Sequence, residues 1–445
     1  MGIRQAINTR LFRHISIAPL VTFRVVFGLV MLISIIRFWL NGWIEEQYIF
    51  PDFHFKYFGF YWVPNLPDWG YYLSFALMAL SALGIALGAF YRISAALFFI
   101  LFTGIELIDA TYYLNHYYFV SVISFLLIFV PAHRMYSLDV RLGLIKLRDS
   151  VPALSIYLIM FQLGLVYFLA GIAKINSDWL FEAMPLSIWL PAQDDFPLIG
   201  SLFQYKLTAF AFSWGGMFYD LLIPFVLLSS RLRWLGYSAV IGFHLMTWFL
   251  FQIGMFPFIM IGATLIFFSA DFHHTSHSFL GGSVKLSDYS SKSTYLSKRA
   301  LIAVSLFICV QIALPFRYLL YPGNMFWHEQ GYRFGWRVML AEKAGYAQFK
   351  VEDSKGRKIL IDNSEFLTPV QEKMMSTQPD FMIQYAQYLK AHYSNLGMDA
   401  ATVKADVYVT LNGRASAPFI DPNIDLASQT DSWSHKQWIL PQKSE

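Results

Sequence analysis

Apolar residues fill this chain in long runs, not in the short alternations that are typical of a soluble fold. The hydrocarbon core of a bilayer is about 30 Å thick, and a helix needs roughly 20 apolar residues to cross it. The sequence therefore predicts about nine transmembrane helices, near residues 17–40, 71–90, 93–110, 117–132, 151–172, 208–229, 233–251, 253–270 and 300–320. The fourth run is short, which indicates a tilted or partly re-entrant segment.

The pattern changes after Tyr321, where polar and apolar residues begin to alternate with the period of half-buried strands. We predict turns at 353–356 and at Asn412-Gly413, and a helix over 369–393 that begins at a proline. The predicted strands are 336–340, 347–351, 358–361, 407–411 and 415–420. The predicted fold class is an all-α polytopic membrane bundle over 1–320, followed by an α+β domain over 321–445.

Two connections within the predicted bundle are long. Residues 41–70 contain three prolines among many aromatic side chains, which favours a packed cap over a mobile linker. Residues 271–298 are rich in Ser, Gly and Lys, and this composition predicts a flexible loop. No sequence repeat relates the two halves of the bundle, which argues against a transporter built from inverted repeats.

Composition agrees with a membrane protein. Of the 445 residues, 56% are hydrophobic and 14% are charged, and the mean hydropathy is +0.46, which excludes an ordinary soluble enzyme. The first apolar run lacks a small-residue cleavage site and is long enough to span, so we expect a retained first helix. The single cysteine, Cys309, allows no intramolecular disulfide.

The basic residues between the runs predict the orientation, because cytoplasmic loops of membrane proteins carry an excess of Lys and Arg. Alternate connections hold most of them: Arg4, Arg10, Arg13, Arg92, Arg134, Arg141, Lys146, Arg148, Arg231, Arg233, Lys285, Lys292, Lys298 and Arg299. The other connections carry only Lys56, Lys174 and Lys206. We predict a cytoplasmic N-terminus and an extracytoplasmic domain over 321–445. No basic and aromatic patch on a soluble face suggests nucleic acid as a partner. The chain has no Asn-x-Ser/Thr site, which fits a bacterial inner membrane.

The most informative stretch is 167–179, where a long apolar run ends in Lys174. An apolar surrounding disfavours the ammonium form of lysine, so such a side chain can act as a base near neutral pH. The alternative is an anchor whose charge reaches the membrane surface, which is common for a lysine at the end of a span. The sequence alone leaves both readings open.

Other polar residues lie at membrane depth. Asp109 and His116 are seven residues apart, two helical turns, so we expect them to share one face near Lys174, with Asn115 beside them. His244 lies within the seventh run, where a histidine is a functional candidate or a helix-to-helix hydrogen bond. For Asp220 and Arg24, in the sixth and first runs, we favour structural roles. We predict no metal site, because no His-Glu-x-x-His motif and no paired cysteines occur.

Several of these segments resemble one known family. The Tyr-Phe-x-Ala-Gly-x-x-Lys stretch that ends at Lys174, the Asp and Thr before Asn115-His116, and the segments around His244 and Met255 occur in the order and spacing of the vitamin K-dependent γ-glutamyl carboxylases, proteins with an HTTM domain. The resemblance implies that Lys174 is the initiating base. It implies that His116 and Asn115 act at the carbanion or the quinone oxygen. The cofactor pocket would then contain His244, Asp109, Met255 and Trp179.

The resemblance also implies a reaction. Vitamin K hydroquinone is oxidised by O2 to the 2,3-epoxide, and this oxidation drives the addition of CO2 to a glutamate side chain of a client protein at the bilayer. Two alternatives stay open: a membrane quinol oxygenase without protein carboxylation, and a binding or transport protein without chemistry. Two departures bear on client recognition. Vertebrate-type members join an outer loop to the distal domain by a disulfide, and they carry a lysine where this chain has Ala173.

Overall fold

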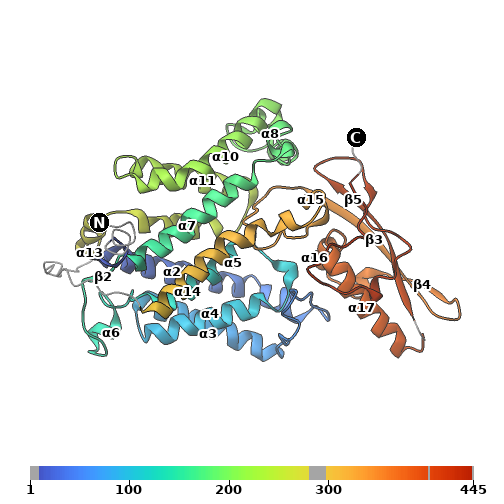
Figure 1. Cartoon of the computed structure of the whole chain (residues 1–445), viewed down its shortest axis with the longest axis horizontal. Helices are drawn as coiled ribbons and strands as arrows, with labels where there is room; N and C mark the ends of the chain where they lie inside the picture. Colours follow the sequence, from blue (N-terminus) through green and yellow to red (C-terminus); the bar gives the residue numbers. More distant parts are fainter. Residues whose placement is uncertain (1–9, 280–296, 399–400, 443–445) are drawn as a thin grey trace.

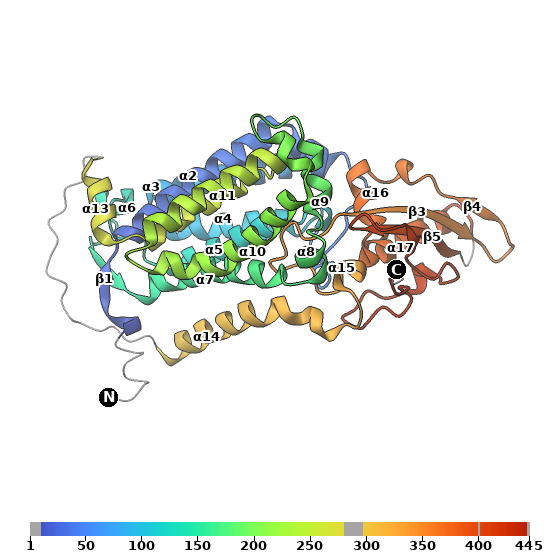
Figure 2. The same cartoon turned by 90° about the horizontal axis from the view of Figure 1, so that it is seen from above.

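The computed structural model describes residues 10–279, 297–398 and 401–442. A helical bundle forms one end of the elongated molecule, and a smaller domain with a β-sheet forms the other (Figure 1). The long helices run side by side along the molecule, and the chain enters the sheet domain only after its last long helix (Figure 2). The molecule is therefore a helical bundle extended at one end by a mixed domain.

Each of the nine predicted runs contains a helix. The helices are α2 (Ala18–Leu40), α3 (Asp68–Leu87), α4 (Tyr91–Glu106), α5 (Asn115–Phe129), α7 (Leu154–Ala173), α10 (Lys206–Leu228), α11 (Arg233–Phe251), α12 (Phe256–Thr264) and α14 (Lys298–Ala313). Within the described residues, six helices are long and apolar enough to cross a membrane. The segment that contains α12 bends by 116° before α13 (Ala270–Phe279), and counting it as one span gives seven. The number nine is not confirmed, because α4 and α5 have only 16 and 15 residues.

Small residues let the central helices approach closely. A Cβ added to Gly171 of α7 would lie 2.8 Å from the backbone nitrogen of Leu221 in α10. A Cβ added to Gly28 of α2 would lie 2.5 Å from the backbone nitrogen of Ala86 in α3. Contacts this short are possible only for glycine, so each glycine fixes how near its two helices lie. The close contact between α7 and α10 places the C-terminal end of α7 against the side chains of α10.

The end of the bundle opposite the sheet domain contains Arg24, which is fully buried and donates to the carbonyl of Tyr136 at 2.6 Å. Nearby, the carboxylate of Asp139 accepts from the backbone N–H groups of Phe90 and Tyr91 at 2.7 and 3.0 Å. These contacts tie the start of α4 to the loop after α5, in agreement with the structural role predicted for Arg24. Of the predicted loop 271–298, residues up to 279 belong to α13 instead, and 280–296, with Lys285 and Lys292, lie outside the described residues.

The sheet domain has four antiparallel strands in the order β4-β3-β5-β6. They are β3 (Lys343–Glu352), β4 (Lys358–Leu360), β5 (Thr402–Leu411) and β6 (Ala417–Pro418). Helices α16 (Pro369–Met375) and α17 (Pro379–Asn395) lie against the sheet and bury an aromatic core with it (Figure 1). The predicted α+β character and both predicted turns are confirmed.

Two predictions within this domain are wrong. Residues 336–340 form no strand, because Trp336 and Met339 have φ angles of 56° and 55°, which a strand cannot adopt. The buried Trp336 instead stacks on Tyr118 of α5, with ring centroids 4.7 Å apart. The single helix predicted over 369–393 is two helices, since Pro379 begins a new helix after an extended Gln378.

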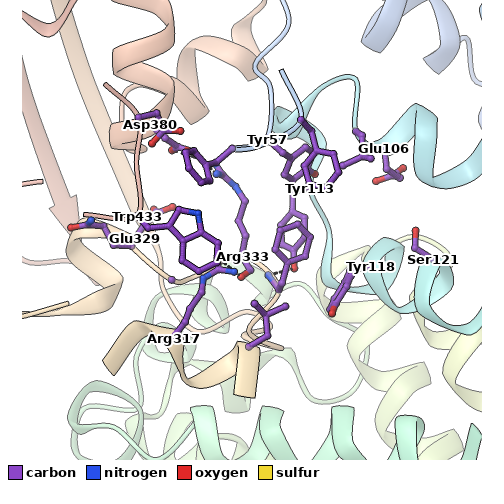
Figure 3. Close-up of a pocket in the computed structure, with 18 of the residues that line it drawn as sticks. Tyr57, Glu106, Tyr113, Tyr118, Ser121, Arg317, Glu329, Arg333, Asp380 and Trp433 are labelled. Atoms are coloured by element: carbon purple, nitrogen blue, oxygen red, sulfur yellow. Dashed lines mark hydrogen bonds and ion pairs between the residues drawn. The ribbon is translucent and has the colours of Figure 1, made fainter. Parts of the chain in front are cut away.

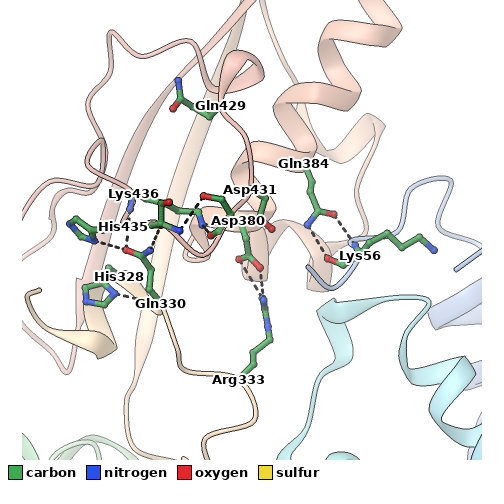
Figure 4. A network of polar contacts seen from close by, with 12 residues as sticks. Lys56, His328, Gln330, Arg333, Asp380, Gln384, Gln429, Asp431, His435 and Lys436 are labelled. Atoms are coloured by element: carbon green, nitrogen blue, oxygen red, sulfur yellow. Dashed lines mark hydrogen bonds and ion pairs between the residues drawn. The ribbon is translucent and has the colours of Figure 1, made fainter. Parts of the chain in front are cut away.

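The predicted cap over 41–70 is confirmed up to Tyr57, whereas most residues from 58 to 69 are exposed. Phe55 stacks on Phe381 of α17 with ring centroids 4.3 Å apart. The backbone of Lys56 exchanges two hydrogen bonds with the side-chain amide of Gln384, at 2.8 and 2.9 Å (Figure 4). Aromatic stacking and hydrogen bonds therefore join the outer loop to the distal domain, where no disulfide can form.

The predicted topology can be tested by labelling introduced cysteines on a Cys309→Ser background. We expect an impermeant maleimide to label Ser416→Cys in intact cells and to label Lys146→Cys only after the membrane is permeabilised, because both residues are exposed at opposite ends of the molecule. Labelling of Lys146→Cys and protection of Ser416→Cys in intact cells would show that the protein has the opposite orientation in the membrane.

Candidate functional site

A cavity of about 570 Å³ lies at the end of the bundle nearest the sheet domain, and Lys174 lines it. We name it the lysine cavity. Its walls come from α7, α10, α11, the start of α12 and the short helices α8 (Ser177–Phe181) and α9 (Leu186–Trp189). Val338 and Met339, from the segment that leads into the sheet, complete the lining. Most of the lining is apolar, and the side chains with polar groups are Tyr167, Lys174, Trp179, Trp189, Asp220, His244 and Thr247.

Lys174 is the residue at which α7 ends, and its side chain is buried. Its Nζ donates to Oδ2 of Asp220 in α10 at 2.7 Å and to the carbonyl of Ala170 at 3.4 Å. Side chains of both partners are 7% exposed. The side chain is thus held inside the protein by an acidic partner, and the alternative of an anchor that reaches the membrane surface is excluded.

Trp179 is held over the lysine by a short turn of chain. The side chain of Asn176 caps α8 (Ser177–Phe181) by accepting from the backbone of Trp179 at 3.0 Å. The indole N–H donates to the carbonyl of Ser213 in α10 at 2.7 Å. These bonds fix the ring, whose centroid is 5.3 Å from Nζ of Lys174, within the distance of a cation–π contact.

His244 faces the same cavity from α11. Its Nε2 is 2.9 Å from the hydroxyl of Tyr167 in α7. Its Nδ1 is buried and has no hydrogen-bond partner within the described residues. Buried polar atoms in proteins are almost always paired. The unpaired nitrogen is therefore a place where a bound molecule can make a hydrogen bond.

His116 and Asn115 do not line the lysine cavity. The ring of His116, at the start of α5, lies 5.5 Å from the ring of Phe256, and Phe256 in turn lies 5.4 Å from His244. The amide of Asn115 donates to the carbonyl of Arg337 at 2.7 Å and accepts from Tyr113 at 3.0 Å. His116 is thus one side chain behind the cavity wall, and Asn115 positions the segment that enters the sheet domain.

Asp109 does not share a helix face with His116, so that prediction is wrong. Helix α4 ends at Glu106, and Asp109 has extended backbone with φ of −137°. Its carboxylate is bound by His54 at 3.1 Å and by Gln371 of α16 at 3.2 Å. Asp109 therefore joins the outer loop, the bundle and the sheet domain. Met255 precedes α12 and packs on the bundle core, outside the cavity lining.

Asp220 and Tyr167 line the cavity, although the sequence analysis assigned neither residue to the cofactor pocket. Asp220 is the single acidic residue of a 23-residue apolar helix, which marks it as a residue that needs a partner. The choice of Lys174 as that partner depends on the α7–α10 approach at Gly171, which no local motif encodes. The cavity pairs an amine with a carboxylate inside an apolar wall, an arrangement that can pass a proton to or from an apolar ligand.

A polar clamp joins the cavity region to the sheet domain. Asp178 of α8 accepts two hydrogen bonds from the guanidinium of Arg414, both at 2.8 Å, and one from Asn412 at 2.6 Å. Burial alone raises the pKa of Asp178, but the bonds from Arg414 and Asn412 outweigh it and lower the pKa below its ordinary value. The β5–β6 turn is thereby held against the end of α7.

We expect the Asp178 clamp to stabilise domain docking at neutral pH and to fail in acid. Because its folded pKa is depressed, its contribution is present above the ordinary Asp pKa of about 3.9 and is lost as pH falls through the folded value. Asp178→Asn should lower the free energy of unfolding by about 1.5–3 kcal/mol at pH 7, measured by thermal unfolding in detergent. Asp362→Asn, at an exposed turn of the sheet domain, is the control. Equal stability of both variants would refute the clamp.

The fold and this cavity define a multi-pass membrane protein whose site lies between helices and an outer domain. A family model described as HTTM domain matches residues 12–272, and one described as Vitamin K-dependent gamma-carboxylase, lumenal domain, matches residues 296–445. The chain belongs to the vitamin K-dependent gamma-carboxylase family, and the second match makes the sheet domain its extracytoplasmic part. No solved structure matches it.

Proposed function

We propose that this protein is a vitamin K-dependent γ-glutamyl carboxylase that couples oxidation of vitamin K hydroquinone by O2 to carboxylation of a protein glutamate with CO2. The observation that carries the proposal is the buried Lys174, paired with Asp220 inside an apolar cavity at the outer end of the bundle. We further propose a bacterial inner membrane as its location, with the N-terminus in the cytoplasm and the client outside.

The residues of the lysine cavity fit a quinol. Aromatic side chains such as Trp179 and Phe251 can pack on a flat ring, while the unpaired Nδ1 of His244 can bond one ring oxygen. The exposed glycines Gly215 and Gly242 line the cavity between α10 and α11, and a Cβ added to either meets no described atom within 4 Å. That space suits a polyprenyl chain that extends into the lipid.

When bound, the hydroquinone and O2 supply the strong base that takes the γ-proton of glutamate, because that proton is too weakly acidic for any side chain. The chain's own residues initiate this reaction. In the apolar cavity, the proton between Nζ of Lys174 and Oδ2 of Asp220 can move to the carboxylate, which leaves a neutral amine. The amine then accepts a proton from a hydroxyl of the quinol.

Other residues position the ligand and exclude water. The hydrogen bond between Tyr167 and His244 fixes the imidazole ring, and Trp179 covers the lysine. Exclusion of water keeps a strong base from being quenched. Val338 and Met339 bring the outer domain into the cavity wall, so a client glutamate held by that domain has a short path to the lysine.

The test is incubation of the purified protein with reduced vitamin K, labelled bicarbonate and a glutamate-rich peptide. We expect the label to appear in γ-carboxyglutamate, and we expect the quinone epoxide to form in proportion to the incorporated label. Epoxide without incorporated label would favour a quinol oxygenase instead. Absence of both products, from protein that is folded and binds the quinol, would refute the proposed chemistry.

We expect His116→Ala to separate the two activities, with epoxidation largely retained and carboxylation reduced. His116 lies behind Phe256, so its removal leaves the Lys174–Asp220 pair in place, while the resemblance gives the matching histidine a role at the carbanion. Both products are measured in one reaction, with His392→Ala in α17 as the control. Equal loss of both activities would contradict this role.

A further inference from the structure

A second cavity, of about 700 Å³, lies where α4, α5 and α14 meet the sheet domain (Figure 3). We name it the junction cavity. Its inner end is lined by Phe99 of α4, Phe125 of α5 and Phe307 of α14, all at membrane depth. Its outer end is lined by polar side chains of the sheet domain and the segment before it. A molecule that fills it needs an apolar part and a polar part.

The inner end of the junction cavity is accessible to lipid. Helix α14 stands apart from the other helices in Figure 2, and only 11% of its apolar window is buried. It contacts the bundle through a polar link, in which Gln311 bonds both Gln162 of α7 and Tyr118 of α5, at 3.2 and 3.1 Å. The aromatic residues that line the cavity at this depth therefore border a groove that a lipid chain can occupy.

Most charges at the outer end are satisfied within the protein. The polar network around them is drawn in Figure 4, where Gln330 accepts from His435 at 2.8 Å. The ion pairs at this end are Arg333–Asp380, Lys436–Asp431 and Lys343–Glu329. Two charged side chains that line the cavity remain outside these pairs: Arg317 and Glu106 (Figure 3).

Glu106 is the last residue of α4, and no hydrogen bond or ion pair joins it to any other described residue. A buried carboxylate stays ionised only beside a cation, so an ammonium group placed next to Glu106 would complete this site. The cavity wall also presents the rings of Tyr57, Tyr113 and Phe334, whose centroids lie 5.2–6.3 Å apart. A carboxylate together with aromatic faces is the combination that binds an organic ammonium group.

Arg317 lies at the outer end of the α14 segment. Among the described residues its guanidinium makes one hydrogen bond, to the carbonyl of Arg333 at 2.8 Å, and it lies 5.8 Å from the ring of Phe334. A guanidinium has five N–H donors in a planar fork that matches a phosphate. The donors left over favour a phosphate at the level where membrane helix and outer domain meet.

We propose that the junction cavity binds one zwitterionic phospholipid, with its phosphate at Arg317, its ammonium group at Glu106 and an acyl chain in the groove beside α14. The two side chains outside the ion pairs carry opposite charges, so a zwitterion complements both. An anionic phospholipid would leave Glu106 without a cation. A free headgroup would leave the aromatic inner end unfilled. The bound lipid joins the isolated α14 to α4 and to the outer domain.

The test is native mass spectrometry of delipidated protein to which phosphatidylethanolamine, phosphatidylcholine or phosphatidylglycerol is returned. We expect one zwitterionic lipid to bind, about tenfold tighter than phosphatidylglycerol. Glu106→Gln should abolish this preference, and Arg317→Gln should weaken binding of all three lipids by about tenfold. Arg299→Gln, at the other end of α14, is the matched control and should bind like the unaltered protein. Equal binding of the anionic lipid, or unaltered binding by both cavity variants, would overturn the proposal.

A second measurement needs no variant. Phosphatidylethanolamine with a photoreactive acyl chain should crosslink the unaltered protein at peptides that contain Phe307 or Phe125. Excess phosphorylethanolamine, which lacks acyl chains, should leave the crosslink in place. Crosslinks confined to other helices, or removal of the lipid by a glutamate-rich peptide, would instead assign the cavity to another ligand. Neither measurement depends on carboxylase activity. The lipid-binding proposal is therefore tested independently of the proposed function.

Discussion

Lys174→Ala is expected to abolish formation of the quinone epoxide while leaving expression and membrane insertion intact. The amine is the group that we propose as the initiating base, and its removal leaves the carboxylate of Asp220 without its partner. Loss of a proton-transfer group that no neighbour replaces lowers the rate by about 10²–10⁴-fold. Epoxide is measured on purified protein with reduced vitamin K.

Two further variants sharpen this test. Lys174→Arg keeps a cation and much of the volume, but a guanidinium does not lose its proton, so it should be as inactive as Lys174→Ala. Lys206→Ala removes an exposed lysine at the start of α10 and should retain activity. A small external amine should restore part of the turnover of Lys174→Ala only, because removal of the lysine side chain leaves space for it. Epoxidation near the normal rate in Lys174→Ala would show that another group is the base.

Asp220→Asn is expected to reduce epoxidation by about 10²-fold, the second largest effect. The amide keeps the shape of the side chain and can still accept a hydrogen bond from Nζ, but it cannot take the lysine's proton. Activity is compared with that of Asp68→Asn, which alters an exposed carboxylate at the start of α3. The double variant Lys174→Ala with Asp220→Asn should be no worse than Lys174→Ala alone, because the two residues act as a unit. Full activity of Asp220→Asn would show that the carboxylate takes no part in the mechanism.

Helices and turns that are encoded by neighbouring residues could be predicted from the sequence. Long apolar runs predicted the helices, and the turn at Asn412-Gly413 followed from residues that tolerate positive φ, 53° and 73° in the structure. The strand predicted at 336–340 failed because Trp336 is placed by its stacking on Tyr118, far away in the sequence. The predicted number of nine spans is not confirmed, because α4 and α5 have only 16 and 15 residues.

The same distinction between local and distant contacts applies to the residues of the candidate site. Lys174, His244 and Trp179 line one cavity, and each lies on a helix or cap that local sequence defines. Asp220 was assigned a structural role because its partner lies 46 residues away, on another helix. Asp109 was placed near His116 on the assumption of a continuous helix. The chain instead leaves α4 at Glu106, and Asp109 faces His54.

The outer domain is attached to the bundle without a covalent crosslink. Phe55 on Phe381, the Gln384 amide and the Asp178–Arg414 pair are all reversible contacts, and the same domain supplies Val338 and Met339 to the cavity wall. Assembly of the cavity is therefore independent of the thiol redox state of the compartment. A reductant that would sever a disulfide-linked relative leaves this junction unchanged, whereas salt and acid, which weaken charged contacts, act on it directly.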